Sequence, residues 1–274
     1  MLPDFAPSPT GLPGLELAQL ADTTLHFLFL MLRIGAFILS APLFSARFIS
    51  LPVRIIITVC LTISLMGHVT VPPASDLAGI PSVVWVIREL VIGLAAGLVL
   101  QILFAAAVMA GDRIANTAGL GLAAQVDPST GGQTPVIGQF FTLFLFVIFM
   151  TQDFHLVVIR LVLESYRILP VGMPMNAAVL VDTAMEATKT MFYDAAKMMM
   201  PAVSVLLIVN IVIGVITRSA PQLNIFAFGF PLTMTATLLL LWLTVSTLAP
   251  ALIDLLDHAT GSIRLMMEGL ADVR

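Results

Sequence analysis

The chain offers few residues that could perform covalent chemistry. Its four histidines lie in different segments, and none belongs to the HExxH pair of a zinc protease. No GxSxG turn for a serine nucleophile and no P-loop for a nucleotide phosphate occurs. The single cysteine, Cys60, lies in an apolar run and is interpreted as a small buried hydrophobic residue. We therefore expect no catalytic residue, no disulfide framework, no metal site and no cofactor.

Two carboxylates come closest to a reactive site. Asp112 follows Gly111, a pairing that suggests an aspartyl intramembrane protease, but that chemistry needs a second carboxylate to share the proton, and no apolar run supplies one. Asp153 and His155 could relay protons in a coupled transporter, although two polar residues at a helix end are more commonly an interfacial cap. The sequence therefore predicts that the protein is not an enzyme.

The composition indicates an integral membrane protein. Hydrophobic residues make up 59% of the chain and charged residues 10%, against about 25% charged residues in typical soluble domains. The mean hydropathy is +1.07, and apolar runs recur at the length that crosses a hydrocarbon layer of about 30 Å. The net charge of −4 provides no basic surface for nucleic acid.

About six apolar runs approach the spanning length, and all are predicted to be helical. They cover Leu17–Ser40, Ile55–Val71, Val83–Ala110, Val136–Met150 with a continuation toward Leu169, Met198–Thr217, and Phe226–Ala249. The expected fold is an all-α polytopic membrane protein of long hydrophobic helices in hairpins, several of them kinked or packed in an assembly. The proline-rich segment 1–16 contains no Lys or Arg, so we expect a flexible tail and no cleaved signal peptide.

The basic residues give two conflicting signals of orientation. Arg47 and Arg54 favour a cytoplasmic first link. A second basic group would lie on the opposite side if six helices span the membrane: Arg160, Arg167, Lys189 and Lys197. Either residues 154–169 form an extra short crossing, or some helices are not ordinary lipid-facing spans.

Polar residues form seams along the apolar helices. Gln19, His26, Arg33 and Ser40 recur every seven residues, which places them on one slowly drifting helical stripe. In the third run four residues are spaced by four, and the glycines form a small-xxx-small pair for close helix packing: Glu89, Gly93, Gly97 and Gln101. In the fifth run the same spacing joins Asn210, Gly214 and Arg218. These seams either hold one subunit together or bind other subunits around a pore.

Two further features suggest buried, nonstandard structure. The link from 111 to 138 is rich in glycine and poor in charge, so it is predicted to fold back into protein, the alternative being a plain flexible loop. The residues that characterise this link are Gly111, Gly119, Gly121, Asp127 and Pro128. The adjacent residues Met198, Met199 and Met200 are either ordinary packing or a soft apolar gasket.

The segment between the last two runs carries the most specific pattern. It sets charged, amide, proline and glycine groups between apolar runs, which hydrocarbon does not tolerate without partners. Its residues are Arg218, Pro221, Gln222, Asn224, Phe226, Gly229, Phe230 and Pro231. This pattern resembles the signature of the flagellar FliR family of the type III export gate. The resemblance continues in Arg88-Glu89 with Gly93 and Gly97, and in Ala110-Gly111 followed by Asp127-Pro128.

The resemblance implies a function that composition does not reach. Members of this family assemble with FliP and FliQ into a helical gate of the bacterial inner membrane and flagellar basal body, through which unfolded flagellar proteins are exported. It implies a FliP-like half at 17–170, with a plug-like loop at 111–138, and a FliQ-like hairpin half with a C-terminal tail at 171–274. FlhB-like and FlhA-like components are further expected partners. The alternative is an ion-coupled small-solute transporter, for which broken helices in inverted repeats would be the sign.

Overall fold

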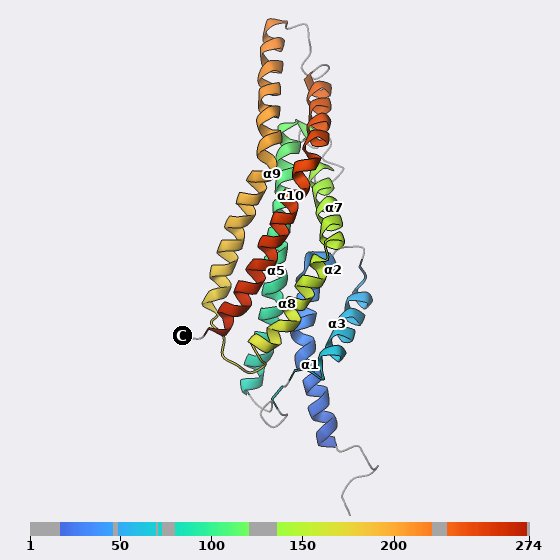
Figure 1. Ribbon diagram of the computed structural model, residues 1–274, viewed down its shortest axis with the longest axis vertical. Helices are drawn as coiled ribbons and strands as arrows, with labels where there is room; N and C mark the ends of the chain where they lie inside the picture. Colours follow the sequence, from blue (N-terminus) through green and yellow to red (C-terminus); the bar gives the residue numbers. More distant parts are fainter. Residues whose placement is uncertain are drawn as a thin grey trace, which may run out of the picture.

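The predicted apolar runs form the long helices of the computed structural model, which describes residues 17–45, 49–69, 71–72, 80–120, 136–220 and 229–272. These residues contain helices and no strand, which confirms the all-α prediction (Figure 1). The helices are α1 (Leu17–Ser40), α2 (Pro42–Ser45), α3 (Leu51–Leu65), α5 (Ile80–Thr117), α7 (Val136–Thr151), α8 (Phe154–Ile168), α9 (Ala178–Ser219) and α10 (Phe230–Ala271).

Among the described residues, fewer helices than the predicted six or so are long and apolar enough to span a membrane. Four helices are long and apolar enough to cross a membrane, within Asp22–Ser40, Ser82–Thr117, Ala178–Ser219 and Pro231–Ala271, and α7 with α8 could form a fifth, broken span.

The second predicted run, Ile55–Val71, is shorter than expected because α3 ends at Leu65 and a turn follows around Gly67. The prediction that Cys60 is buried was wrong, since its side chain is exposed on α3. This helix packs mainly on α1, so its other side is left without a neighbour from the described part of the chain. An apolar run therefore predicted the helix, but not which of its residues the core covers.

The fourth predicted run divides into two helices that meet at an angle of 68°. Asp153 lies between them in the left-handed conformation, with φ of 58°. Asp adopts this conformation more readily than most residues, and it interrupts the helical dihedral angles of α7. The Asp153 carbonyl then accepts hydrogen bonds from Leu156 and Val157, which begins α8.

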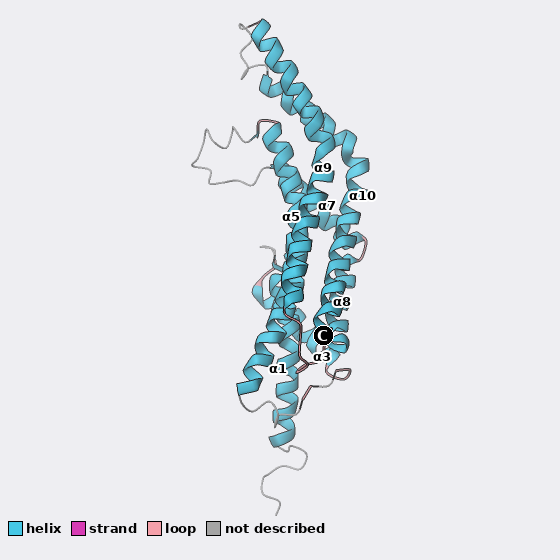
Figure 2. Ribbon diagram, turned by 90° about the vertical axis from the view of Figure 1, so that its left-hand side faces the viewer, coloured by secondary structure: helices cyan, strands magenta, loops and turns pink. Residues whose placement is uncertain are grey.

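Helices α9 and α10 form an antiparallel hairpin that is much longer than the fifth and sixth apolar runs. Each contains 42 residues and is therefore about 63 Å long. Their upper part extends beyond the other helices in both side views (Figures 1 and 2). Pro201 lies inside α9 and Pro250 inside α10.

Two side-chain pairs fix the register of this hairpin. Lys197 Nζ lies 2.8 Å from Asp254 Oδ2, and His258 Nδ1 lies 2.9 Å from Asp194 Oδ2. The Asp194 side chain is almost completely buried, whereas the other pair is half exposed. Because both pairs join α9 to α10 in the same antiparallel alignment, they hold the lower halves of the two helices side by side.

Helix α5 is the centre of the bundle. It packs against α1, α7, α9 and α10, and the largest hydrophobic cluster takes residues from both predicted halves of the chain. The predicted boundary at residue 170 falls in the non-helical segment between α8 and α9. Across that boundary, however, the two halves share one core.

Candidate functional site

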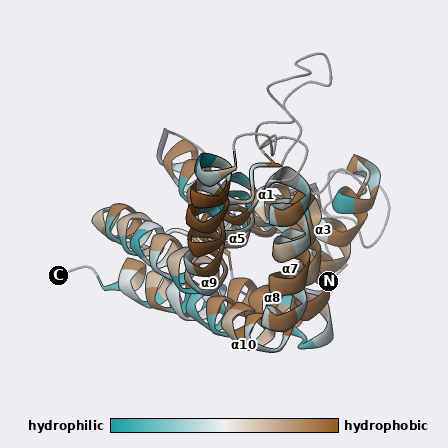
Figure 3. Cartoon of the chain, turned by 90° about the horizontal axis from the view of Figure 1, so that it is seen from above, coloured by the Kyte–Doolittle hydropathy of each residue, from teal (hydrophilic) through white to brown (hydrophobic). Residues whose placement is uncertain are grey.

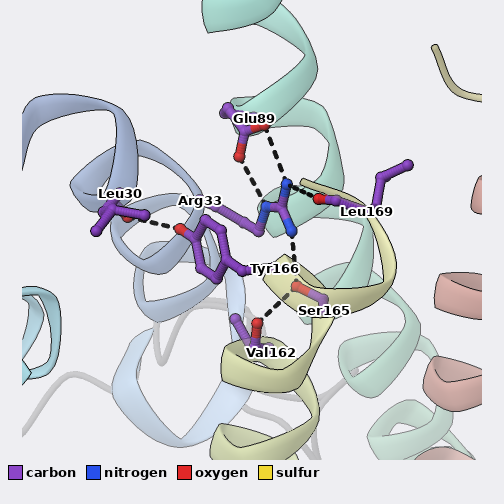
Figure 4. Close-up of polar contacts among 7 residues, drawn as sticks. All are labelled: Leu30, Arg33, Glu89, Val162, Ser165, Tyr166 and Leu169. Carbon is purple, nitrogen blue, oxygen red and sulfur yellow. Dashed lines mark hydrogen bonds and ion pairs between the residues drawn. The ribbon is translucent and has the colours of Figure 1, made fainter. Parts of the chain in front are cut away.

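A buried polar cluster joins α1, α5 and α8 in the lower half of the bundle (Figure 4). We call the side chains of Arg33, Glu89, Ser165 and Tyr166, with the carbonyl of Leu169, the Arg33 cluster. Arg33 is 0% exposed and Glu89 is 2% exposed. The guanidinium group donates to both Glu89 oxygens, from Nε to Oε2 at 2.8 Å and from Nη2 to Oε1 at 3.0 Å.

Two further donors of Arg33 are also satisfied. Nη1 donates to Ser165 Oγ at 2.9 Å, and Nη2 donates to the Leu169 carbonyl at 2.9 Å. The Tyr166 ring lies 4.1 Å from the guanidinium carbon, and its hydroxyl donates to the Leu30 carbonyl at 2.7 Å. A bidentate arginine–carboxylate pair with further hydrogen bonds to the guanidinium group is the arrangement in which a buried charge pair is tolerated.

The backbone of α5 approaches α1 closely enough for Glu89 to reach Arg33 because α5 carries glycines there. A Cβ atom at Gly93 would collide with the Arg33 carbonyl oxygen and lie 2.9 Å from Ala36 Cβ. A Cβ at Gly97 would collide with Ser40 Oγ and lie 2.8 Å from the Ala41 nitrogen. The small-xxx-small pair therefore lies directly at the α1–α5 contact.

The Arg33 cluster has the geometry of a structural lock rather than of a reactive site. Its two charges neutralise each other and are removed from solvent. The cluster holds α1, α5 and α8 in a fixed arrangement. Its hydrogen bonds connect α8 to α1, which lies more than 100 residues earlier in the chain.

We predict that Tyr166→Phe destabilises the protein by about 1 kcal/mol, because it removes one buried hydrogen bond and keeps the ring beneath Arg33. Tyr166→Leu should cost more, since it also removes the cation–π contact. The thermal unfolding midpoints of the purified proteins measure the difference. Equal midpoints for the wild type and Tyr166→Leu would contradict the prediction.

Other seam residues have different surroundings. The Asn210 side chain donates to the Thr117 carbonyl at 2.9 Å and so caps the C-terminal end of α5. A Cβ atom added at Gly214 would have no atom of the described residues within 4 Å beyond its own helix.

Arg88 takes no part in the Arg33 cluster, and among the described residues its buried Nε finds no hydrogen-bond partner. Ser40 of the first stripe bonds to its own helix, and Gln101 of the third run is exposed.

The bounds of the predicted plug-like loop need correction. Helix α5 continues through Thr117, and α7 begins at Val136, so both ends of the 111–138 link are helical. Gly111 is buried in α5, where a Cβ would lie 2.6 Å from Gly138 Cα; the two glycines permit close packing of α5 and α7. Gly119 follows α5 with φ of 82°. Gly121, Asp127 and Pro128 lie outside the described residues.

Half of the family motif also lies outside the described residues, namely Pro221, Gln222, Asn224 and Phe226. Arg218 is exposed in the last turn of α9. Gly229 is buried just before α10, Phe230 begins that helix, and Pro231 is exposed.

The three adjacent methionines point in different directions from α9. Met198 is buried and lines a cavity of about 170 Å³ between α5, α7, α9 and α10, Met199 is half-buried, and Met200 is exposed. Successive helical residues are rotated by about 100°, so one helix cannot present all three to a single opening. The gasket role remains a hypothesis that would need further methionines from neighbouring chains.

Several polar residues of the structure were not identified from sequence. Ser165 and Tyr166 gave no signal beyond their place on one face of an amphipathic segment, and the pairing of Asp194 with His258 spans two helices. Asp153 and His155 share no hydrogen bond or ion pair within the described ranges: Asp153 caps α8, and the His155 ring lies against Phe149. No group of three possible metal ligands occurs among the described residues.

A family model and individual relatives place the chain in the same protein family. The family described as "Bacterial export proteins, family 1" matches residues 24–259. The flagellar biosynthetic protein FliR of Escherichia coli K12 is 30% identical over 223 residues, covering 80% of this chain and 84% of the relative.

Two further relatives with the same description show similar agreement. The protein of Pectobacterium carotovorum is 32% identical, with 82% of this chain and 86% of the relative covered. The protein of Bacillus subtilis 168 is 27% identical, with 81% of this chain and 86% of the relative covered. These matches and the apolar helices together show that the chain belongs to the FliR family of bacterial export proteins, as a membrane-embedded component of the flagellar export apparatus.

Proposed function

We propose that this chain is the FliR-type subunit of an export gate in the bacterial inner membrane. In this proposal it assembles with FliP-type and FliQ-type subunits into a channel for unfolded flagellar proteins, and FlhB-like and FlhA-like components join the same apparatus. The chain contributes helices and a seal, and other components supply the energy.

The observation that carries the proposal is the exposed upper half of the α9–α10 hairpin. Each helix is about twice as long as the hydrocarbon layer is thick. Large apolar side chains point away from the chain's own core on both helices, at Val205, Leu207, Ile208, Ile211, Val215, Leu238, Leu239, Trp242 and Leu243. Viewed from above, the near part of α9 is strongly hydrophobic (Figure 3). Neighbouring subunits that cover this surface would account for a hairpin that projects beyond its own bundle.

Single cysteines on the hairpin test the assembly. We would first replace the exposed Cys60 with serine, and then introduce Ile208→Cys or Trp242→Cys and attach a thiol-specific photoreactive reagent. After illumination in cells, both positions should form cross-linked products with the FliP-type or FliQ-type subunits. Cells that lack those subunits provide the control and should lose the products. Labelling of lipid alone in complete cells would refute the proposed assembly.

A separate prediction concerns the seal of the closed gate. We predict that deleting residues 123–133 leaves the complex assembled and makes the membrane permeable to small ions, because a glycine-rich segment with little charge can fold in a narrow pore at low desolvation cost. The deletion should not extend into α5 or the turn that follows it, because Ala115 in α5 and Ala118 just after it are buried in the core.

Ion flux into liposomes that carry the assembled complex measures this effect. Deletion of residues 2–12 is the matched control and should leave flux at the intact level. If the deletion of 123–133 also leaves flux unchanged in a normally assembled complex, the seal lies elsewhere, and Met198–Met200 is the next segment to test.

A further inference from the structure

The exposed side of α8 carries two arginines beside an apolar groove. The groove has a volume of about 350 Å³ and lies between α8 and the C-terminal end of α3. Its apolar lining consists of Leu65, Leu156, Ile159 and Leu163, and its polar lining consists of Arg160, Glu164 and Arg167. The opposite side of α8 is buried and carries Ser165 and Tyr166 of the Arg33 cluster.

Neither arginine has a partner of opposite charge within the described part of the chain. Neither Arg160 nor Arg167 takes part in the pairs formed by Arg33, Lys189, Lys197 and His258. Both side chains are exposed, as is that of Glu164 between them. Arg167 lies in the last turn of α8, where the helix dipole favours a positive charge, but this effect does not extend to Arg160.

The surroundings of the groove are apolar as well. Leu156 and Val157 of α8 and Ile63 of α3 are exposed large hydrophobic residues. In a membrane-embedded protein, such side chains lie against lipid chains, and long arginine side chains extend from that surface toward the polar headgroups. The guanidinium group is well suited to a phosphate, because it offers two parallel N–H donors.

We propose that this side of α8 binds an anionic phospholipid. Its phosphate would lie at Arg160 and Arg167, which are about 10.5 Å apart along the helix axis, and one acyl chain would lie in the groove over Ile159 and Leu163. Glu164 disfavours a second negative charge at the same place and limits the affinity. The Arg33 cluster positions this site, because it fixes the rotation of α8 about its own axis.

Native mass spectrometry of the detergent-purified chain, with its copurified export components, tests the proposal. The probes are dioleoyl phosphatidylglycerol and dioleoyl phosphatidylcholine, which differ in headgroup charge and share the same chains. Near a surface each basic residue contributes about 1 kcal/mol to binding of anionic lipid, so Arg160→Gln with Arg167→Gln should weaken phosphatidylglycerol binding at least about tenfold. Phosphatidylcholine binding should not change.

Two further variants sharpen the result. Arg113→Gln with Arg264→Gln removes two exposed arginines elsewhere and should leave both lipids unaffected. Glu164→Gln should strengthen phosphatidylglycerol binding about fivefold on the same scale, which a merely destabilised protein would not do.

Three outcomes would overturn the proposal. The first is equal phosphatidylglycerol binding by the wild type and the Arg160→Gln/Arg167→Gln variant. The second is displacement of the lipid by glycerol phosphate at a similar concentration, which would show a headgroup site without a chain in the groove. The third is loss of lipid binding on full assembly of the complex, which would make the groove a contact between subunits. None of these results bears on whether the complex forms a channel, since the cross-linking experiment tests that separately.

Discussion

Glu89→Leu is expected to destabilise the protein by about 3–5 kcal/mol, the typical cost of removing one partner from a buried ion pair. Arg33 is completely buried, and guanidinium groups stay charged in proteins. Without Glu89, two of its donors lose their acceptors, and the charge remains inside the bundle. We expect a large loss of folded protein from membranes and loss of flagellar motility.

The reciprocal variant should be milder, because it leaves a group that can become neutral. Arg33→Met leaves a carboxyl group in the bundle, and a buried carboxyl group without a cation is neutral in general, so the remaining cost is that of an unpaired polar group. The double variant Arg33→Met/Glu89→Leu should recover much of the loss, since both polar groups are gone and the replacements are apolar. Denaturant unfolding in detergent measures all three.

The exposed pair Lys189–Glu186 provides a matched control. Its side chains are 75% and 63% exposed, and exposed pairs contribute little to stability. Lys189→Met should therefore change the free energy of unfolding by less than about 1 kcal/mol. If Arg33→Met/Glu89→Leu is less stable than either single variant, the cluster does not act as a paired unit.

Gly97→Leu is expected to prevent the correct packing of α1 on α5, at a cost of about 3 kcal/mol. The first atom of the new side chain would meet Ser40 Oγ and the Ala41 backbone nitrogen, and a backbone atom cannot move aside as a flexible side chain can. Gly93 should be equally intolerant, because its nearest neighbour is the Arg33 carbonyl.

Gly214→Leu distinguishes the packing of helices within the chain from the assembly of the chain with other subunits. No described atom approaches a Cβ at that position, so the isolated chain should fold as well as the wild type. A lower yield of the complex with Gly214→Leu would then reveal a close contact with another subunit. Protease resistance of the chain and gel filtration of the complex measure the two effects. A protease-resistant Gly97→Leu chain with a normal unfolding midpoint would refute the packing argument.

The comparison of these glycines illustrates what the sequence could predict. Gly93–Gly97 and Asn210–Gly214 share the same spacing, and the spacing predicted that a helix could approach closely. The spacing did not indicate whether a neighbouring helix actually packs against each pair, as α1 packs against Gly93 and Gly97. That depends on contacts between residues far apart along the chain. For the same reason Arg33 and Glu89 were recognised as seam residues, whereas their pairing and the contributions of Ser165 and Tyr166 were not.

The helix bounds show a similar limit. Apolar length predicted α1, α5 and α7 well, because a hydrocarbon environment favours helices wherever the run is long enough. Gly111 was interpreted as the start of a loop, but packing against Gly138 outweighs its low helix propensity. The lower halves of α9 and α10 are amphipathic rather than uniformly apolar, so run length alone missed them.

The two internal prolines affect the stiffness of the α9–α10 hairpin. Without an N–H group, Pro201 leaves the Lys197 carbonyl, and Pro250 the Ser246 carbonyl, without the usual helical donor. The alignment set by Lys197–Asp254 and Asp194–His258 brings Pro201 and Pro250 to the same height on facing helices. A rod of two helices is weakest where both lack a backbone bond, so its flexure concentrates there. Bending of the hairpin is therefore confined to this height, between the two side-chain pairs below it and the Asn210–Thr117 hydrogen bond above it.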